Sequence, residues 1–276
     1  MSVPAFAVFG HPIAHSLSPR IHQAFAAQFG LTLSYRSIDA APEVFADAVA
    51  GFFGAQGGRG ANVTLPHKAA AYALATRHSA TARQAGTCNV LTPAADGTLD
   101  GHNTDGIGLV RDLRQRHGVS LAGARVLLLG AGGASRGVAG PLLDAQLAEL
   151  HVVNRRADGA RALAAAFDDP RLVAHGWDAL ADLRGFDLVL HATAAGVLGE
   201  SLALPTGLLG ATGVAYDLSY GPAARAFVAW GRAAGARLAI DGLGMLVETA
   251  ADAFALWHGR MPATEPVYRA LRSPPA

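Results

Sequence analysis

Short apolar runs alternate with alanine-rich segments of helical periodicity along almost the whole chain. Short runs of apolar and β-branched residues predict strands, whereas apolar residues spaced three and four positions apart predict helices. A regular alternation of the two is typical of α/β proteins built from βα units. We therefore expect an α/β protein in which such layers, each with a parallel sheet, occur twice.

The first group of predicted elements lies in the N-terminal part of the chain. Strands are expected at 5–9, 33–38 and 60–64, and helices from about Pro19, Val44 and Pro66. A hairpin is expected at 89–92 and 98–102, because Asp96-Gly97 between these runs is a strong turn signal. A helix that begins near Ile107 then connects this group to the next.

The second group of predicted strands follows the connecting helix. These strands are expected at 125–129, 150–153, 172–174, 187–191, 214–218 and 237–240, with helices in most of the gaps. A last helix, at about 244–257, comes after this sheet is complete and is expected to return to the first domain. The pattern predicts two domains, an N-terminal α/β domain at 1–104 plus 241–276 and a Rossmann-type doubly wound domain at 105–240.

Composition narrows the classes of protein to consider. The 276 residues suffice for two modest domains, and 22 basic against 21 acidic residues leave a formal charge of +1. Without a strong basic field, neither a nucleic acid nor a membrane surface is an expected partner. No segment of about 20 apolar residues could span a bilayer, and the first residues predict a strand rather than a signal peptide. The single cysteine, Cys88, cannot form an internal disulfide, which favours a reducing compartment and hence the cytoplasm.

A glycine-rich turn after the predicted strand at 125–129 carries the clearest ligand motif. The sequence GAGGASRG at 130–137 stands between that strand and a predicted helix. Gly130 permits a tight turn, Gly132 lets a pyrophosphate approach the backbone, and the helix start offers free N–H groups. An ordinary strand-to-helix loop is the alternative. The context favours a dinucleotide, with contacts expected at Gly130, Ala131, Gly132, Gly133 and Ala134.

The residues after the next predicted strand indicate which dinucleotide binds. An NAD-binding domain usually places Asp or Glu about 20 residues beyond the glycines, whereas this chain has Asn154-Arg155-Arg156. Guanidinium groups bind a phosphate through charge-assisted, bidentate hydrogen bonds, so the sequence favours the 2′-phosphate of NADP. The alternative is that the arginines only solvate a loop. Arg161 competes with Arg156 as the second phosphate ligand.

Ser16 and Ser18 belong to the first of three polar clusters near predicted strand ends, where α/β proteins bind ligands. Ser18 before Pro19 predicts a helix N-cap and first turn, and capping alone would explain the pair. Two hydroxyls at a helix start also suit a carboxylate, because hydroxyl donors, free N–H groups and the helix dipole all favour an anion.

Lys68 ends the second cluster, GANVTLPHK at 60–68. It is expected in the first turn of a helix, where the dipole disfavours a cation and helps it to release a proton. That position suits general acid–base chemistry, although a first-turn lysine is more commonly a plain surface residue. Asn89 and Asp105 belong to the third cluster. Asp105 is a helix N-cap by default and gains interest only if the fold brings it beside Lys68.

The order of these clusters resembles one protein family, the shikimate dehydrogenases, over nearly the whole chain. The motifs that carry the resemblance are GHPIAHSLSP, GANVTLPHK, AGTCN, GHNTDG, LLLGAGGASRG, NRR, YDLSY and DGLGMLVETAA. The resemblance implies an N-terminal substrate domain completed by the C-terminal helix, and a central NADP-binding domain. It also implies reversible reduction of 3-dehydroshikimate to shikimate, a step of chorismate and aromatic amino-acid biosynthesis.

The resemblance also implies roles for individual residues. Lys68 would accept the hydroxyl proton in the oxidation direction, with Asp105 orienting it. The implied substrate contacts are Ser16 and Ser18 for the carboxylate, Thr64, Asn89 and Asp105 for ring hydroxyls, and Tyr220 and Thr249. The other implied cofactor contacts are Asn154, Arg155, Arg156, Thr193, Gly242 and Met245. A glycine turn before a buried helix would explain Gly242 and Met245 nearly as well.

Two departures from the family pattern leave alternatives open. Thr249 stands in the last helix where the family usually has a glutamine, and threonine is shorter and cannot donate an amide hydrogen bond. The nearest alternative is therefore a dehydrogenase for quinate or an amino-substituted shikimate. His191 stands where the family usually has the asparagine of a strand-end NAT motif. A more distant alternative is a non-catalytic NADP-binding sensor, which would not need Lys68 and Asp105.

The remaining polar residues give weaker signals. The 11 histidines show no metal-ligand spacing such as H-E-x-x-H, so no metal is expected. His11 and His15 flank the substrate loop and are more simply explained by loop or packing roles. Cys88 is expected to be a small buried side chain. The expected partner is a small-molecule substrate, and the chain is expected to be a monomer or a homodimer.

Overall fold

The computed structural model describes residues 3–273, which form two compact units. Among these residues, the first unit contains those up to Gly108 and those from Leu246 onward, and the second unit is Leu109–Met245. The chain thus leaves the first unit once and returns to it at the C-terminal end. Both crossings lie a few residues beyond the boundaries placed from the sequence.

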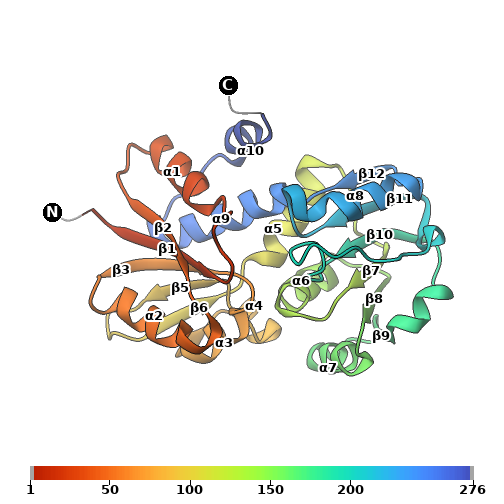
Figure 1. The fold of residues 1–276 in the computed structure, drawn as a ribbon, viewed down its shortest axis with the longest axis horizontal. Coiled ribbons are helices and arrows are strands. Elements are labelled where there is room, and N and C mark those ends of the chain that lie inside the picture. The colour runs from red at the N-terminus through yellow and green to blue at the C-terminus, as the bar shows by residue number, and fades with distance from the viewer. Residues whose placement is uncertain (1–2, 274–276) are drawn as a thin grey trace. The chain divides into compact units, whose positions relative to one another are not determined.

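A six-stranded sheet in the order β2-β1-β3-β5-β6-β4 forms the framework of the first unit (Figure 1). Its strands are β1 (Ala5–Gly10), β2 (Ser34–Asp39), β3 (Gly58–Val63), β4 (Arg77–His78), β5 (Val90–Pro93) and β6 (Leu99–His102). β1 pairs in parallel with β2 and β3, whereas β5 pairs antiparallel with β3 and β6. This sheet is therefore mixed, which corrects the expectation of a parallel one, because the turn at Asp96-Gly97 folds β6 back along β5.

Helices pack on both faces of this sheet because its central strands bury side chains on both sides. Ala7 and Phe9 of β1 lie in a core cluster with α2, whereas Phe6 and Val8 lie in a cluster on the opposite face that contacts Trp257. The helices of this unit are α1 (Ser18–Gln28), α2 (Phe45–Phe53), α3 (Lys68–Leu74), α4 (Ala80–Ala85), the start of α5 (Asp105–Arg111), most of α9 (Leu243–His258) and α10 (Thr264–Arg272).

The second unit contains a parallel six-stranded sheet in the order β12-β11-β10-β7-β8-β9. Its strands are β7 (Arg125–Leu129), β8 (Glu149–Asn154), β9 (Leu172–Gly176), β10 (Phe186–His191), β11 (Leu209–Asp217) and β12 (Leu238–Ile240). The strand order reverses between β7 and β10, which confirms the doubly wound fold. Ligands of such sheets bind beyond the carboxyl ends of the strands at this switch point.

The helices of the second unit cover both faces of its sheet. Leu128 of β7 lies in one core cluster with α6 (Gly133–Asp144) and α7 (Ala157–Phe167), while Leu129 lies in another with Phe227 of α8 (Arg225–Ala233). Short 3-10 turns lie in the two units at Pro42–Val44, Trp177–Ala181, Thr206–Leu208 and Gly221–Ala224, and a π-helical turn lies at Asp112–Arg116.

Every strand that the sequence predicted is present, but three short or polar elements were missed. They are β4, α4 and α10. β4 has only two residues, and α4 has six, so neither gives a periodic pattern. In α10 only Val267 is buried, which leaves little apolar signal in the sequence.

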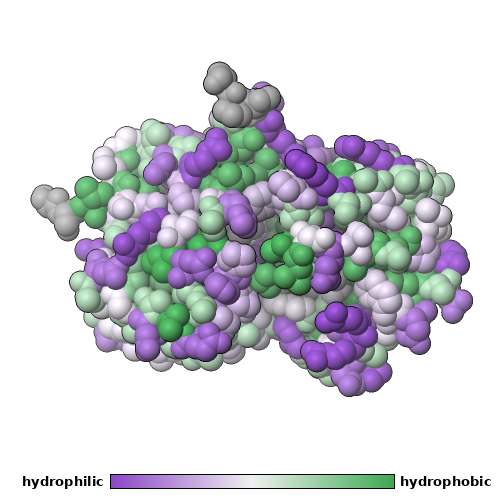
Figure 2. Space-filling model, viewed as in Figure 1, coloured by the Kyte–Doolittle hydropathy of each residue, from purple (hydrophilic) through white to green (hydrophobic). Residues whose placement is uncertain are grey.

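Polar and apolar side chains are interspersed over the face of the molecule seen in Figure 2. Within residues 3–273, no helix has both the length and the hydropathy that crossing a membrane requires. In that same part of the chain, no three His, Cys, Asp or Glu side chains are grouped so as to hold a metal ion.

Candidate active site

Lys68 and Asp105 form a short ion pair inside the first unit. Lys68 Nζ lies 2.6 Å from Asp105 Oδ2, and the two side chains are 14% and 5% exposed. Lys68 is the first residue of α3 and Asp105 is the first residue of α5, so both groups stand at helix starts. The ammonium is therefore fixed in place by a buried carboxylate, an arrangement that the sequence alone could not establish.

Asn89 hydrogen-bonds to the other carboxylate oxygen of Asp105. Asn89 Nδ2 donates to Asp105 Oδ1 at 2.9 Å and to Thr104 Oγ1 at 3.0 Å. Asn89 Oδ1 accepts from the Thr104 N–H at 2.9 Å, and the Asp105 N–H donates to Asn103 Oδ1 at 3.1 Å. Because the ammonium engages one carboxylate oxygen and the amide the other, the orientation of Asp105 is fixed.

Backbone hydrogen bonds bring the segments that carry these residues together. The Cys88 N–H donates to the Lys68 carbonyl at 2.9 Å, which joins the start of α3 to the segment before β5. The Asn89 N–H donates to the carbonyl of His102, and the Asn89 carbonyl accepts from the N–H of Val63. Asn89 is thus held between β6 and β3, and its side chain reaches the start of α5.

Thr64 follows β3 and lies against Gly10, the last residue of β1. A Cβ at Gly10 would lie 2.7 Å from Thr64 Cγ2, so only glycine permits this approach without a shift of the threonine. The Thr64 N–H donates to the Phe9 carbonyl at 2.9 Å, and the His11 N–H donates to the Leu65 carbonyl at 3.0 Å. The loops that follow β1 and β3 therefore lie side by side.

Ser18 was wrongly predicted to be a helix N-cap. It is the first residue of α1, and the N-cap position is Leu17, which makes no side-chain cap bond. The capping contact comes instead from Ser16, whose Oγ accepts from the Ser18 N–H at 3.3 Å. The side chain of Ser18 is buried. Both serines still lie at the N-terminal end of α1, as a carboxylate site requires.

Thr249 of α9 lies against α5 at Gly108. A Cβ at Gly108 would lie 2.3 Å from Thr249 Oγ1. The Thr249 carbonyl accepts from Thr104 Oγ1 at 3.3 Å, which links α9 to the segment that carries Asp105. Thr249 Oγ1 is buried, and it has no hydrogen-bond partner within residues 3–273. The position that departs from the family pattern therefore lies next to the Asn89–Asp105 pair.

The glycine turn of the second unit joins β7 to α6. Gly130 has a φ of +109°, a conformation that favours glycine, and a Cβ there would lie 3.1 Å from the Ala192 carbonyl oxygen. A Cβ at Gly132, the N-cap of α6, would meet no atom within 4 Å. Ala131, Gly133 and Ala134 complete the turn and the first helical residues. The start of α6 thus lies beside open space, which is what a phosphate needs to reach its N–H groups.

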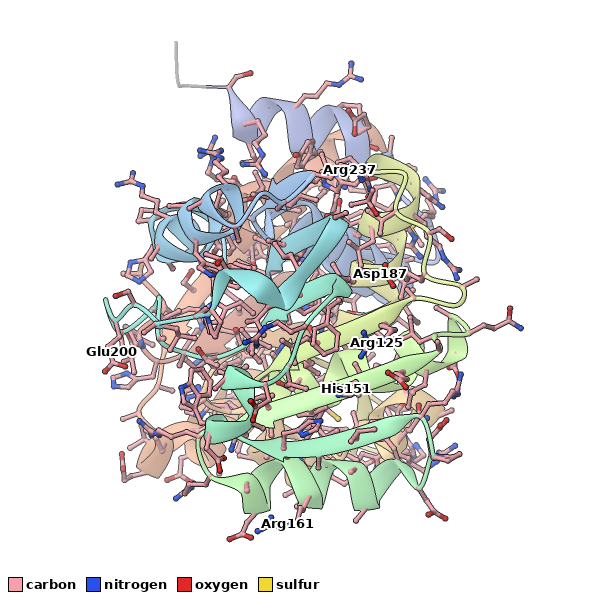
Figure 3. The ribbon with its side chains drawn as sticks, turned by 90° about the vertical axis from the view of Figure 1, so that its right-hand side faces the viewer. Arg125, His151, Arg161, Asp187, Glu200 and Arg237 are labelled. Carbon is pink, nitrogen blue, oxygen red and sulfur yellow. The ribbon has the colours of Figure 1, made fainter. Side chains whose placement is uncertain are left out.

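Arg155 and Arg156 follow β8 and are exposed. Among residues 3–273, neither guanidinium has an ion-pair partner. Arg161, by contrast, pairs with Asp158 at 2.5 Å at the surface of α7 (Figure 3). Asn154 Nδ2 donates to the Arg156 carbonyl at 2.8 Å and fixes the course of this loop. Arg155 and Arg156 are therefore available to bind a phosphate, whereas Arg161 is already in an ion pair, which favours the first two as phosphate ligands.

The other predicted site residues of the second unit follow β10, β11 and β12. They are Thr193, Tyr220, Gly242 and Met245. The Gly242 N–H donates to the Ser219 carbonyl at 2.7 Å, and a Cβ at Gly242 would lie 2.3 Å from the Leu218 carbonyl oxygen. The Met245 N–H donates to the Tyr216 hydroxyl at 3.3 Å. Close packing therefore accounts for the glycine at 242, and a ligand role for these residues stays a prediction.

A buried polar network behind the site was not predicted. Asn62 Oδ1 lies 2.7 Å from the Tyr35 hydroxyl and 3.1 Å from His22 Nε2, while Asn62 Nδ2 donates to the Asn89 carbonyl at 3.4 Å. Burial lowers the pKa of His22 to about 3, so its imidazole is neutral at physiological pH. The signal in the sequence was Asn62, a polar residue in a predicted buried strand, because a buried polar side chain needs a hydrogen-bond partner.

Cys88 has no chemical role at this site. It is fully buried, as expected, and burial raises the pKa of its thiol to about 12. The thiol is therefore protonated at neutral pH and is a poor nucleophile. Lys68 and Asp105 remain the residues predicted to carry the chemistry.

Comparison with known proteins gives the family. Three family models match the chain: shikimate dehydrogenase substrate binding domain at 8–91, shikimate / quinate 5-dehydrogenase at 112–198, and shikimate 5′-dehydrogenase C-terminal domain at 242–272. A shikimate dehydrogenase (NADP(+)) of Xanthomonas campestris pv. campestris (strain B100) is 55% identical over 276 residues, covering 99% of this chain and 97% of that protein. The chain belongs to the shikimate dehydrogenase family.

Solved structures agree with the family. An Ael1 enzyme from Pseudomonas putida matches with a TM-score of 0.87 at 41% identity, covering 98% of this chain and 99% of that one. A shikimate 5-dehydrogenase from Thermus thermophilus, solved in complex with NADP(H) and shikimate, matches with a TM-score of 0.84 at 36% identity and the same coverage. The resemblance found in the sequence motifs is thereby confirmed over nearly the whole chain.

Proposed function

We propose that this chain is an NADP-dependent shikimate dehydrogenase that reversibly reduces 3-dehydroshikimate to shikimate. One observation carries the chemistry: the ammonium of Lys68 lies 2.6 Å from the buried carboxylate of Asp105. Oxidation of a ring hydroxyl needs a positioned group that takes up the hydroxyl proton. A non-catalytic sensor would have no need of such a pair.

The predicted site residues of the first unit then have the following roles in the reaction. Lys68 takes the hydroxyl proton as the neutral amine in the oxidation direction and returns it from the ammonium in the reduction direction, while Asp105 and Asn89 keep its Nζ in position. Thr64 and Asn89 hold ring hydroxyls, and Ser16 and Ser18 bind the substrate carboxylate at the start of α1. Tyr220 is proposed as a further substrate contact from the second unit. NADP, when bound, supplies or takes up the hydride.

The second unit fits NADP by its own geometry. The pyrophosphate would bind at the glycine turn, where Gly132 leaves open space at the N-cap of α6. Arg155 and Arg156 would hold the 2′-phosphate, since their charges are unpaired in residues 3–273. Thr193, Gly242 and Met245 are proposed contacts of the other half of the cofactor. The domain roles follow, with substrate bound by the first unit and NADP by the second.

Thr249 supports one competing substrate, quinate or an amino-substituted shikimate. Its buried hydroxyl has no partner within residues 3–273 and lies against Gly108, and its carbonyl accepts from Thr104, which also bonds to Asn89. A threonine occupies less space than glutamine, so a substrate with an additional ring substituent could be accommodated. The observation bears on substrate preference alone, and Lys68 would act in the same way on either acid.

One experiment tests the proposal directly. Absorbance of the reduced nicotinamide is followed with shikimate and with quinate, each with NADP⁺ and with NAD⁺. We expect the largest kcat/KM with shikimate and NADP⁺. A larger value with quinate would reassign the substrate, and binding of NADP⁺ without turnover of either acid would favour a sensor.

Two properties of the protein in the cell are part of the same proposal. A cytoplasmic location is supported by the single, buried Cys88, because an oxidising compartment favours paired cysteines. A monomer or a homodimer is the expected assembly. Size-exclusion chromatography with light scattering would measure which of the two is present.

A further inference from the structure

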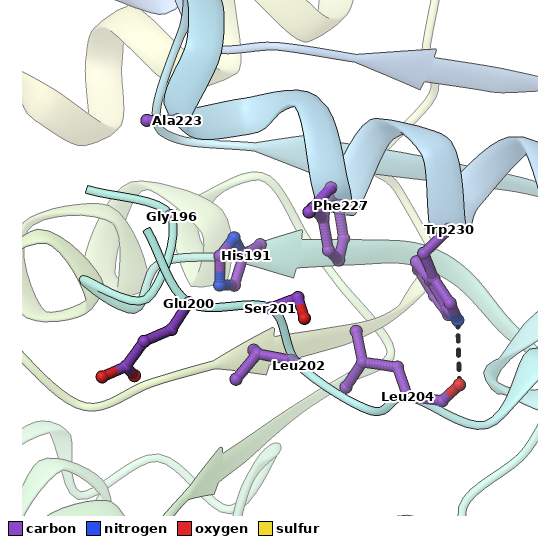
Figure 4. A pocket seen from close by; sticks show the side chains of 10 residues that line it. His191, Gly196, Glu200, Ser201, Leu202, Leu204, Ala223, Phe227 and Trp230 are labelled. Atoms are coloured by element: carbon purple, nitrogen blue, oxygen red, sulfur yellow. Dashed lines mark hydrogen bonds between the residues drawn. The ribbon is translucent and has the colours of Figure 1, made fainter. Parts of the chain in front are cut away.

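A buried chain of hydrogen bonds ends at Thr193, beyond β10 of the second unit. His191 Nδ1 lies 2.8 Å from Asp217 Oδ2, and His191 Nε2 lies 2.7 Å from Thr193 Oγ1. Asp217 is fully buried and His191 is 3% exposed. The ring of His191 stacks on Phe227 of α8, which holds its plane, as Figure 4 shows. Nothing in the proposed reaction uses this imidazole or this carboxylate.

The groups at each end of this series of hydrogen bonds determine which atoms donate and which accept. A carboxylate only accepts hydrogen bonds, so Nδ1 of His191 carries a proton and donates it to Asp217. Asp217 Oδ1 accepts from the Ser219 N–H at 2.8 Å, which orients the carboxylate. In the neutral imidazole Nε2 then has only a lone pair, so the Thr193 hydroxyl must donate to it.

With a neutral imidazole, Thr193 is left with accepting capacity only. Its proton is committed to His191, and one of its two lone pairs accepts from the Ala195 N–H at 3.3 Å. The second lone pair has no partner within residues 3–273. A ligand that meets this hydroxyl must therefore offer it an N–H or an O–H, and a phosphate oxygen would not be recognised.

Thr193 also lies at the switch point of the sheet. A Cβ at Gly130, in the glycine turn, would lie 3.2 Å from Thr193 Cγ2. β7, β8 and β9 form the half of the sheet that carries the glycine turn and Arg155, so that half would hold the adenosine with its 2′-phosphate. The nicotinamide nucleoside would then lie over β10, β11 and β12. Its hydrogen-bond donors are the carboxamide NH₂ group and the ribose hydroxyls.

We propose that His191, held by Asp217, is a positioning residue that fixes the Thr193 hydroxyl as an acceptor for a donor group of the nicotinamide nucleoside of NADP. This proposal rests on the proposed function, because it requires that NADP is the cofactor. The recognised group is either the carboxamide NH₂ or a ribose hydroxyl, and the two are separated by the choice of ligand.

The test measures dissociation constants by titration calorimetry at about pH 9, where an ordinary imidazole is neutral. The ligands are NADP⁺, its 3-acetylpyridine analogue, which lacks the NH₂ donor, and 2′,5′-ADP, which lacks the whole nicotinamide nucleoside. The variants are Thr193→Val and His191→Asn. An asparagine amide reaches Asp217 from the place of Nδ1 and does not reach Thr193. Thr206→Val, at an exposed position of the same unit, is the matched control.

Each variant is expected to weaken NADP⁺ binding about 3- to 10-fold, which is the contribution of one neutral hydrogen bond. The double variant should lose no more than Thr193→Val alone, because both changes remove one contact. Affinity for 2′,5′-ADP should stay constant in every variant, which a general loss of structure would not allow. Loss for NADP⁺ but not for the acetylpyridine analogue identifies the carboxamide, and equal loss for both identifies a ribose hydroxyl.

Three results would count against the proposal, each in a different way. If the parent chain binds NADP⁺ but Thr193→Val or His191→Asn binds it equally well, Thr193 is not an acceptor set by His191. If the parent chain itself fails to bind NADP⁺, the proposed function fails first. Separate losses that add up in the double variant would likewise exclude a shared contact.

Discussion

The ammonium of Lys68 depends on its neighbours for its position. Asp105 binds it through one oxygen, and Asn89 holds the other oxygen of the same carboxylate. Neither Lys68 nor Asp105 has an unusual identity for its place in the sequence, since surface exposure would explain the lysine and helix capping would explain the aspartate. Their chemistry follows from contacts between segments that lie 16 to 37 residues apart.

Lys68→Ala is expected to lower kcat far more than it changes the dissociation constant of shikimate. The variant loses the group that transfers the proton, and loss of general acid–base catalysis typically costs about 10²- to 10⁴-fold. Steady-state kinetics with NADP⁺ and shikimate, combined with calorimetric titration of shikimate, separate the two effects. An unchanged kcat would exclude Lys68 as the proton-transfer group.

His22 is expected to make the protein less stable in mild acid. Burial lowers its folded-state pKa from 6.5 to about 3, so below pH 6.5 the unfolded chain binds a proton that the folded chain does not. The stability is complete above pH 6.5 and is lost as the pH falls towards 3, at up to about 1.4 kcal/mol per pH unit. By pH 5 this residue alone should cost about 2 kcal/mol.

Urea unfolding at pH 7.5 and pH 5 would check this dependence. In His22→Gln an amide replaces the ring nitrogen that bonds to Asn62, and the titrating group is gone. The parent chain should therefore lose about 2 kcal/mol more than the variant over this interval. Equal losses in both proteins would show that His22 does not account for the acid sensitivity.

At the level of elements, helix starts and helix crossings position the site. α3 and α5 begin with Lys68 and Asp105, and α5 meets α9 where Gly108 faces Thr249. The crossing is close because position 108 has no side chain. Glycine in a helix interior ordinarily costs stability, so its presence here is explained by packing rather than by helix propensity.

Two helical glycines should respond in opposite directions to alanine. Gly51 of α2 has no atom within 4 Å of its would-be Cβ, so Gly51→Ala is expected to stabilise the protein by about 0.5–1 kcal/mol. At Gly108 the added Cβ would lie 2.3 Å from Thr249 Oγ1 and 2.9 Å from the Thr249 N, and overpacking of this kind costs about 1–3 kcal/mol. Urea midpoints of the two variants give the comparison. Stabilisation by both substitutions would contradict the close crossing of α5 and α9.

At the level of the whole molecule, a ligand that binds to one unit should raise the free energy of unfolding of the protein. Ligand that binds only the folded state adds about 2.7 kcal/mol at a concentration of 100 times Kd. The second unit is a continuous stretch of chain with its own core, so the effect should appear as a higher melting temperature with NADP⁺. If Arg155 and Arg156 bind the 2′-phosphate as proposed, this effect should be specific for NADP⁺.

Arg155→Ala is therefore expected to reduce the thermal shift caused by NADP⁺ and to leave the shift caused by NAD⁺ almost unchanged. Only NADP⁺ carries the phosphate that the guanidinium binds. Arg161→Ala is the control, because Arg161 already pairs with Asp158 and should affect neither ligand. Equal losses for NADP⁺ and NAD⁺ in Arg155→Ala would mean that this arginine does not read the 2′-phosphate.

The sequence by itself determined the α/β class, every major strand, the glycine turn and the family. Apolar periodicity and glycine spacing are local properties, so they can be recognised in the sequence itself. Local reasoning failed where two neighbours compete for one role, as when Ser16 rather than Ser18 supplies the capping contact. It also missed polar partners in the core, such as Asn62 with Tyr35 and His22.

Only the tertiary structure decided that Lys68 meets Asp105 and that His191 lies between Asp217 and Thr193. The contacts of Lys68 with Asp105 and of His191 with Asp217 join residues 37 and 26 positions apart, which no periodicity relates, because the strands and turns between them set the distances. Spacing along the chain determines which face of an element a residue occupies, whereas the packing of elements determines which charges and lone pairs meet. The Lys68–Asp105 pair and the contacts of His191 with Asp217 and Thr193 are consequences of that packing.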